Sequence, residues 1–177
     1  MKYYKKIIGK KCYLSPINLD DAGKYAEWLN DLEVSQYLTL RSLNINMDSE
    51  KAALEKLSQV HNYAIINNQN DELIGNCGFV EIDNLNNTGE VGIFIGNKEY
   101  WGKGYGTEAL KLLISYGINY LNIRNIMIRV YSYNTRAIKS YKKVGFKEIG
   151  VRRKALVFNN QEHDIIFMDL ISEEYIQ

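Results

Sequence analysis

The first part of the chain passes from a short strand pattern to two helical patterns. Residues 10–17 (KKCYLSPI) predict a strand, and a helix follows from the acidic pair at residues 20–21, where negative charge suits a helix start. Residues 37–47 show no clear period and are expected to form a loop or a short helix. A second helix is predicted over residues 48–60, with apolar positions at Ala52, Leu54 and Leu57.

Three strand patterns then follow in close succession. They cover residues 63–67 (YAIIN), 73–82 (LIGNCGFVEI) and 89–96 (GEVGIFIG). The stretches NNQND and DNLNNT separate them and consist of residues that favour turns. Together these features predict an antiparallel meander.

The last part of the chain alternates between helices and strands. A wide apolar face at helical spacing predicts a helix with Leu110, Leu113, Ile114, Gly117, Ile118 and Leu121 on one side. A strand over residues 125–132 is followed by a short helix, which Asn134 caps and Gly145 ends. Residues 146–151 and 163–170 predict two final strands joined by a hairpin connection (VFNNQEH). This order predicts a mixed α/β domain whose sheet contains at least one parallel step.

Composition and charge narrow the class of protein. The chain has 177 residues, of which 46% are hydrophobic, and its single proline and lack of a Ser/Gly-rich linker predict one domain over residues 1–177. Its 22 Lys and Arg against 21 Asp and Glu imply no general attraction to nucleic acid or to anionic membranes. Cys12 and Cys77 are too few and too far apart for a disulfide framework or a zinc cluster. Because no apolar run is long enough for a membrane span or a signal peptide, a cytoplasmic location is expected.

The stretch EYWGKGYGTEAL carries the strongest candidate chemistry. It places Gly102, Gly104 and Gly106 at alternate positions, with Lys103 among them, between a predicted strand and a predicted helix. Glycines allow positive φ and let the unpaired N–H groups of a helix start lie close to an anion. The stretch therefore indicates either a phosphate-binding loop or, with equal weight on these residues alone, a tight turn between strand and helix.

Two common nucleotide-binding motifs do not fit this stretch. A P-loop requires Ser or Thr directly after its lysine, whereas Lys103 is followed by Gly104. A dinucleotide fingerprint requires a third glycine where Thr107 stands and an acidic residue about 20 positions further on, where LNIRNIM offers none.

The glycine stretch and a second segment together resemble the GNAT superfamily of acetyl-CoA-dependent N-acetyltransferases, in the branch of ribosomal-protein and spermidine acetyltransferases. Gly104 and Gly106 fill the glycine positions of the family pattern Arg/Gln-x-x-Gly-x-Gly/Ala, and Trp101 stands where Arg or Gln is usual. The segment NTRAIKSYKKVGF resembles the second signature of that branch, Asn-x-x-Ala-x-x-x-Tyr-x-x-x-Gly-Phe. The similarity covers residues 63–170, and the N-terminal part matches only loosely.

The resemblance implies a fold and a cofactor site. The fold would be a central, mostly antiparallel sheet with one splayed parallel step, flanked by helices. Backbone amides of the glycine stretch would bind the diphosphate of acetyl-CoA, the preceding strand would lie beside the pantetheine arm, and basic residues of the short helix would meet the 3′-phosphate. The cofactor-binding residues implied are Ile93, Phe94, Ile95, Trp101, Gly102, Lys103, Gly104, Tyr105, Gly106, Thr107, Asn134, Lys139 and Lys142.

Acetyl transfer to an amine requires a neutral nitrogen, a polarised carbonyl and a stabilised thiolate, but no metal and no enzyme nucleophile. Tyr141 matches the family tyrosine that donates a proton to the departing thiolate, although spacing alone favours a buried aromatic side chain. For the base there are two candidates, Glu81 on a face with Phe79 and Glu90 in GEVGI, and a water chain is the alternative. Glu81, in a VEID segment that resembles the spermidine acetyltransferase strand, is preferred.

The sequence thus predicts an enzyme that transfers an acetyl group from acetyl-CoA to a primary amine. The resemblance implies a protein N-terminal α-amine or a small polyamine as acceptor, and homodimers are frequent among similar enzymes. A non-catalytic acyl-CoA-binding sensor is the first alternative, and a nucleotide-binding protein of unrelated fold is the second. The identity of the acceptor stays open.

Overall fold

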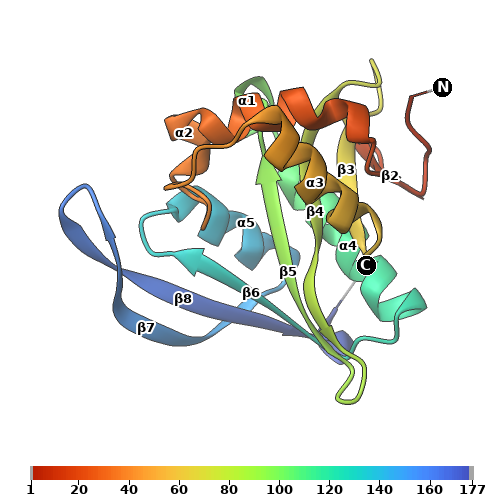
Figure 1. Cartoon of the computed structure of the whole chain (residues 1–177). Helices are drawn as coiled ribbons and strands as arrows, with labels where there is room; N and C mark the ends of the chain where they lie inside the picture. The colour runs from red at the N-terminus through yellow and green to blue at the C-terminus, as the bar shows by residue number, and fades with distance from the viewer. Residues whose placement is uncertain (1, 176–177) are drawn as a thin grey trace. The chain divides into compact units, whose positions relative to one another are not determined.

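Helices and strands follow one another in the expected order in the computed structural model, which describes residues 2–175 (Figure 1). The strands are β1 (Ile7–Ile8), β2 (Cys12–Pro16), β3 (Asn62–Asn67), β4 (Leu73–Asp83), β5 (Thr88–Ile95), β6 (Asn125–Tyr131), β7 (Lys147–Phe158) and β8 (Gln161–Ile171). The helices are α1 (Ala22–Asn30), α2 (Leu32–Ser35), α3 (Met47–Ser58), α4 (Tyr105–Tyr120) and α5 (Thr135–Val144), with 3₁₀ turns η1 (Leu19–Asp21), η2 (Lys98–Tyr100) and η3 (Ser172–Glu174). None of these described helices combines the length and the hydropathy that a membrane span requires.

The strands of the described residues form a sheet in the order β1-β2-β3-β4-β5-β6-β8-β7. The β5–β6 pair is parallel, whereas the β1–β2, β2–β3, β3–β4, β6–β8 and β7–β8 pairs are antiparallel. The mixed α/β fold and the parallel step in a mostly antiparallel sheet are therefore confirmed.

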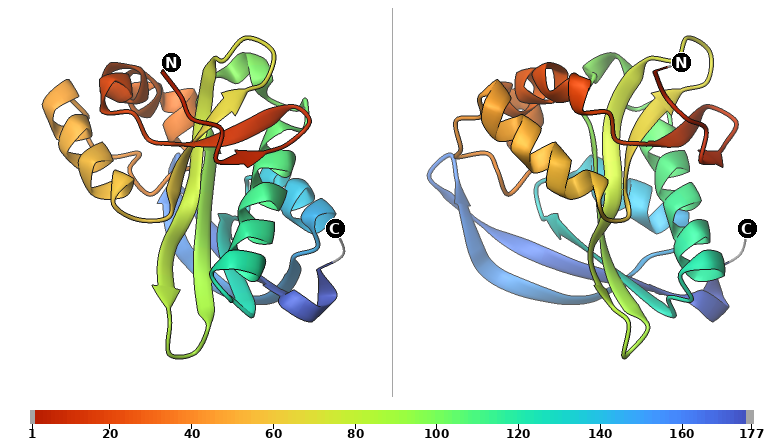
Figure 2. Two further views of the ribbon diagram at one scale, coloured as in Figure 1. Left: turned by 90° about the vertical axis from the view of Figure 1, so that its right-hand side faces the viewer. Right: turned by 45° about the vertical axis from the view of Figure 1, so that its right-hand side comes forward.

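The chain divides into two compact units, of which the first comprises Met1–Gly78 and Ile93–Leu113. Its strands bury both faces, because Tyr13 pairs with Ile66 on one face and Leu14 pairs with Ile65 on the other. The Tyr13 face belongs to a core cluster with side chains from the N-terminal helices, among them Tyr25, Trp28 and Leu54. Figure 2 shows α1 and α3 on one side of these strands and the first part of α4 on the other.

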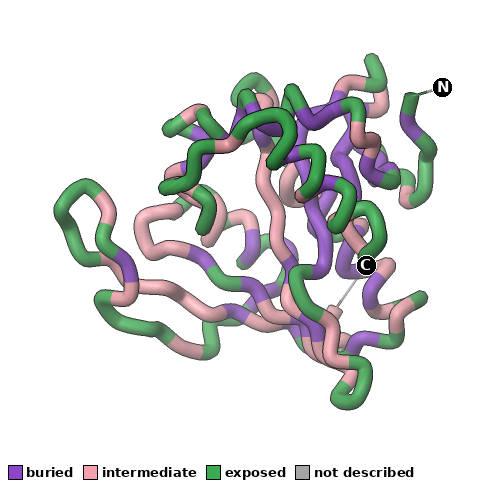
Figure 3. Tube along the Cα trace, in the orientation of Figure 1, coloured by how far each residue is buried: buried purple, intermediate pink, exposed green. Residues whose placement is uncertain are grey.

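The second unit comprises Phe79–Gly92 and Ile114–Gln177. Within it, β5 pairs with β6 only from Thr88 to Glu90, so that Val91 and Gly92 have no partner on β6. Along β6 the buried residues Ile126, Ile128 and Val130 alternate with less buried ones, an alternation visible in Figure 3. The early end of the β5–β6 register leaves the backbone groups of Val91 and Gly92 that face β6 without a partner on that strand.

Three parts of the fold differ from the sequence expectation. Neither β1 nor α2 was predicted, because segments of two and four residues are too short to show a period. The strand expected from residue 10 begins at Cys12, since Lys10 and Lys11 lie in the turn between β1 and β2. The last two strands are longer than predicted and meet at Asn159 and Asn160, which both have positive φ as a two-residue hairpin turn requires.

At Gly117 in α4, the packing of the side chains and the helix propensity predict opposite effects of a substitution on stability. Replacing an interior helix glycine with alanine ordinarily stabilises a helix by up to about 1 kcal/mol. A Cβ on Gly117 would lie 2.5 Å from Cζ of the buried Phe79, so Gly117→Ala should instead destabilise the protein, by about 1–3 kcal/mol. The matched control is Gly23→Ala in α1, whose Cβ would meet only Met47 Cε at 3.6 Å. In urea unfolding the two variants should shift the midpoint in opposite directions, and a stabilising Gly117→Ala would contradict this packing.

Candidate active site

The glycine stretch links η2 to α4 through two residues in the left-handed region of backbone conformation. Gly102 has φ +71° and Gly104 has φ +86°, values that residues with a Cβ rarely adopt. A Cβ on Gly106 would make only an ordinary contact of 3.5 Å with Ile95 Cγ1. Gly102 and Gly104 are therefore required by the conformation of the backbone. Gly106 is not required in this way, but its missing side chain leaves the backbone of the first helical turn uncovered.

The start of α4 presents a positive end to the loop. The first intrahelical hydrogen bond runs from the Glu108 N–H to the Gly104 carbonyl at 3.0 Å. The first turn of a helix presents its N–H groups outward, and the helix dipole adds partial positive charge there. This arrangement, with Lys103 in the exposed loop, can bind a phosphate group.

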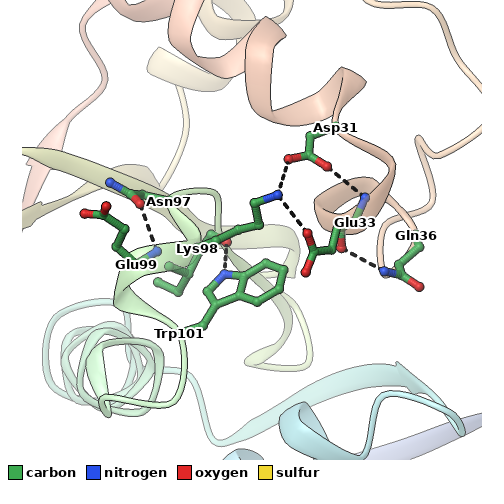
Figure 4. A network of polar contacts seen from close by, with 8 residues as sticks. Asp31, Glu33, Gln36, Asn97, Lys98, Glu99 and Trp101 are labelled. Carbon is green, nitrogen blue, oxygen red and sulfur yellow. Dashed lines mark hydrogen bonds and ion pairs between the residues drawn. The ribbon is translucent and has the colours of Figure 1, made fainter.

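Side-chain contacts fix the segment that leads into the loop (Figure 4). The Trp101 indole N–H donates to the Ile95 carbonyl at 2.7 Å. The Lys98 ammonium lies 2.8 Å from both Asp31 Oδ2 and Glu33 Oε2, at the junction of α1 and α2. Hydrogen bonding to Lys98 is the main reason that the pKa of Asp31 lies below its ordinary value. The segment after β5 is thus tied to the N-terminal helices.

A second set of contacts fixes the same segment from the start of β4. Glu72 accepts hydrogen bonds from the Tyr100 hydroxyl at 2.6 Å and from the Asn97 side-chain amide at 2.8 Å. The Tyr100 ring lies edge-on to Tyr105, with 5.0 Å between ring centroids. One carboxylate therefore holds two residues of the segment, and Tyr100 in turn packs against the first residue of α4.

The turn between β1 and β2 contacts the far side of the loop. The Glu108 carboxylate accepts hydrogen bonds from the Lys11 backbone N–H at 2.7 Å and from the Cys12 N–H at 3.4 Å. The Lys11 ammonium donates to the Lys103 carbonyl at 2.8 Å. The loop is consequently held on both sides within the first unit.

Tyr141 lies on α5, in the second unit, with its ring almost completely buried. Only 8% of the residue is exposed, and the ring lies 6.1 Å from that of Phe146. Burial raises the pKa of the Tyr141 hydroxyl above its ordinary value, so the group is protonated at neutral pH. Within residues 2–175 the hydroxyl has no hydrogen-bond partner, which leaves its proton available to another acceptor.

Asn134 places Tyr141 by starting α5. Its side chain accepts a hydrogen bond from the Ala137 N–H at 3.2 Å, as a helix N-cap does. Gly145 ends the helix with φ +119°, and its N–H bonds back to the Tyr141 and Lys142 carbonyls. The basic residues Lys139 and Lys142 both lie exposed on this helix.

The two candidate bases, Glu81 and Glu90, have different surroundings. Glu90 lies 2.6 Å from Arg129 Nε and keeps only 13% of its side chain exposed, whereas Glu81 is exposed. Alternation places Glu81 on the face of Phe79, which packs against α4, and places Glu90 on the opposite face. The structure therefore places the two carboxylates on opposite faces, and in the described part of the chain Glu90 has a basic partner while Glu81 has none.

The remaining candidate residues are divided between the two units. The cofactor-binding candidates of the first unit are Ile93, Phe94, Ile95, Trp101, Gly102, Lys103, Gly104, Tyr105, Gly106 and Thr107. The second unit holds the other three cofactor-binding candidates, Asn134, Lys139 and Lys142. It also holds all three catalytic candidates, Tyr141, Glu81 and Glu90.

Both cysteines lack the reactivity of a nucleophile. Cys12 and Cys77 are buried and form no disulfide. Burial raises the pKa of the Cys12 thiol to about 12, with a smaller contribution from the Glu108 charge. Burial likewise raises the pKa of Cys77 well above its ordinary value, so both groups stay thiols at neutral pH.

The residues that hold the loop were missed by sequence reasoning. Lys11, Glu72, Lys98 and Glu108 act through contacts with residues far away in the chain, and such pairs leave no periodic pattern. The one signal available for Lys98 was the presence of two acidic residues, Asp31 and Glu33, just after the first predicted helix.

Comparisons with known proteins point to one family. The sequence profile of the acetyltransferase (GNAT) domain matches residues 11–147, which include both the glycine stretch and α5. The uncharacterized N-acetyltransferase p20 of Bacillus licheniformis is 29% identical over 168 residues, 92% of this chain and 93% of p20. The putative ribosomal N-acetyltransferase YdaF of Bacillus subtilis is 31% identical over 102 residues, 56% of this chain and 55% of YdaF. The structure of spermidine N-acetyltransferase from Vibrio cholerae, in complex with CoA and spermine, has the same fold, with a TM-score of 0.83 and 20% identity over 96% of this chain and all of that one.

The ion pairs of Lys98 should stabilise the folded protein at neutral pH and lose this effect in acid. Because Asp31 has a lowered pKa in the folded state, its contribution is present above the ordinary value of 3.8 and is lost as the pH falls through the folded value. Lys98→Met should therefore lower the free energy of unfolding by a constant amount between about pH 6 and 8, and this deficit should shrink below about pH 4. Urea unfolding across this range measures it, with exposed Lys51→Met in α3 as control. A deficit that grows in acid would contradict this assignment.

Proposed function

The chain belongs to the GNAT acetyltransferase family, and from this membership we propose that it transfers an acetyl group from acetyl-CoA to a primary amine. The observation that carries the proposal is the glycine loop at the start of α4. Its two positive-φ glycines, its helix N-terminus and its side-chain anchors form a rigid anion site inside the region that the family profile matches.

The proposed roles of the cofactor residues follow from this loop. Backbone N–H groups of residues 102–107 bind the diphosphate, with Lys103 as an added cation and Trp101 fixing the entry to the loop. Ile93, Phe94 and Ile95 pair through their backbone with the pantetheine amides. Asn134 contributes a hydrogen bond toward the cofactor, and Lys139 and Lys142 meet the 3′-phosphate.

Tyr141 serves as the proton donor in the proposed reaction. The neutral amine attacks the thioester carbonyl carbon, the carbon–nitrogen bond forms, and the carbon–sulfur bond breaks to release the CoA sulfur. A buried, protonated hydroxyl with no other partner among the described residues can donate a hydrogen bond to that sulfur as negative charge develops on it. The proton lost by the amine balances the one that the thiolate takes up.

Glu81 stays the first candidate for the base that takes the ammonium proton, ahead of Glu90 and a water chain. The Glu90 carboxylate is already engaged by Arg129 at 2.6 Å and only 13% of its side chain is exposed, so it is less open to a substrate amine. Glu81 forms no ion pair with any residue from 2 to 175 and is open to solvent.

The proposed acceptors are the amines of the relatives. One relative is a putative ribosomal N-acetyltransferase, and a protein of the same fold was solved with spermine, so a protein N-terminal α-amine and a small polyamine are the two classes to test. One catalytic domain over residues 1–177, a cytoplasmic location and a homodimer are further proposals that rest on the same resemblance.

A thiol-release assay with acetyl-CoA tests the proposed function directly. The acceptor panel holds spermidine, spermine, an aminoglycoside and peptides with ribosomal-protein N-termini. Thiol release that depends on one acceptor class supports the proposal and identifies the substrate. Binding of acetyl-CoA without release on any acceptor would favour a non-catalytic sensor, and absence of binding would overturn the cofactor assignment.

Tyr141→Phe should separate catalysis from binding. Because the ring and its packing are kept while the donor is removed, kcat should fall by about a hundredfold or more. The dissociation constant for acetyl-CoA, measured by calorimetry, should stay within about twofold, a change of about 0.4 kcal/mol, because the substitution leaves the proposed diphosphate loop untouched. Tyr63→Phe, which removes a hydroxyl from another buried tyrosine, is the control and should keep its activity. Equal losses in kcat and affinity would show that Tyr141 packs rather than donates.

A further inference from the structure

The turn between β1 and β2 reaches the glycine loop with a lysine side chain. The turn closes through a hydrogen bond from the Gly9 N–H to the Cys12 carbonyl at 2.9 Å, and it carries Lys10 and Lys11, both exposed. The Lys11 ammonium donates to the carbonyl of Lys103 at 2.8 Å and lies 5.7 Å from the centroid of the Tyr105 ring. This contact joins residues 92 positions apart in the chain.

The hydrogen bond from Lys11 sets the direction of the next N–H group. Residues 103 and 104 share one peptide plane, and no peptide bond of the described chain is cis. In a trans peptide the carbonyl and the N–H point in opposite directions. A Lys103 carbonyl held toward Lys11 therefore turns the Gly104 N–H away from Lys11, toward the side of the loop that the turn leaves open.

Lys11 also keeps its charge available, in contrast to Lys98. Lys98 is paired with two carboxylates, which neutralise it. The acceptor for Lys11 is an uncharged carbonyl, and none of the ion pairs among residues 2–175 includes Lys11. A full positive charge thus stays beside Gly104, whose own Cβ, if present, would lie 3.8 Å from the Lys11 Nζ.

The same turn binds a carboxylate whose charge would otherwise oppose an anion. Glu108 lies in the first turn of α4, where a free carboxylate would repel a diphosphate. Its Oε1 instead accepts the backbone N–H groups of Lys11 and Cys12, so the carboxylate is directed to the β1–β2 turn. Gly9 permits this approach, because a Cβ at that position would collide with Glu108 Oε1.

We propose that Lys11 is a positioning residue of the acetyl-CoA site. It acts through the Lys103 carbonyl to direct the Gly104 N–H at the diphosphate, and it places a positive charge next to Gly104. This inference rests on the proposed function, since it needs the glycine loop to bind the diphosphate. It predicts that Lys11 matters for the phosphate-bearing part of the cofactor and not for the thioester chemistry.

The test compares Lys11→Met with Lys10→Met, which removes the neighbouring charge from the same turn. The dissociation constant for acetyl-CoA should rise about tenfold in Lys11→Met, the size expected for loss of a charge-assisted hydrogen bond, and stay within about twofold in Lys10→Met. kcat at saturating cofactor should be unchanged. Acetyl-pantetheine, which lacks the diphosphate and the nucleotide, should be used equally well by the wild type and by Lys11→Met.

Two further variants separate hydrogen bond from charge. Lys11→Arg keeps both and should restore affinity to within about threefold of the wild type, whereas Lys11→Gln keeps a donor without the charge and should fall between Lys11→Arg and Lys11→Met. These two also keep the test available if Lys11→Met does not fold.

Each other outcome overturns the inference. Equal weakening by Lys10→Met and Lys11→Met would show a bulk charge effect. An equal loss with acetyl-pantetheine would show a general disturbance of the fold, and unchanged affinity would show no role for Lys11. If the wild type binds acetyl-CoA and Lys11→Met binds it with the same affinity, this inference alone is rejected. If the wild type neither binds nor uses acetyl-CoA, the proposed function is rejected as well.

Discussion

The direction of the backbone N–H groups between η2 and α4 is the constraint on which the proposed chemistry depends. An anion site made of amides works only if the amides already point at the anion, because ordering a free loop costs about 1–2 kcal/mol per residue. Gly102 and Gly104 make the required path possible through positive φ, but glycine also increases the freedom that must be removed. The contacts from Asp31, Glu72 and the β1–β2 turn restrict that freedom from three separate parts of the first unit.

Proton balance sets a second constraint, on Tyr141 and the candidate bases. Burial holds the pKa of Tyr141 above that of an ordinary thiol, which is about 8.5. The phenol is thus a weaker acid than the thiol it would form, so Tyr141 first donates a hydrogen bond to the developing charge, and its proton moves to the sulfur only after the carbon–sulfur bond has broken. Glu90 is held in an ion pair with Arg129, whereas the Glu81 side chain is exposed to solvent.

Local signals in the sequence predicted the elements that carry the site. The cap at Asn134, the stop at Gly145 and the apolar face of α4 are each determined by neighbours within a few residues, and the structure confirms them. The anchors of the loop were not predictable in this way, because the partners of Lys11 and Glu108 depend on tertiary folding rather than on spacing. The glycine spacing located the loop and the family resemblance gave it a role, whereas the contacts that hold it appear only in the folded chain.

The most direct measurement is a titration of the isotope-labelled protein with CoA, followed through the backbone amide resonances. The account predicts that the largest shifts fall on Gly104, Tyr105 and Gly106, that they saturate at one CoA per chain, and that pantetheine without phosphates does not produce them. Binding of CoA that leaves these amides unchanged would contradict the account, since the diphosphate would then lie somewhere other than the start of α4.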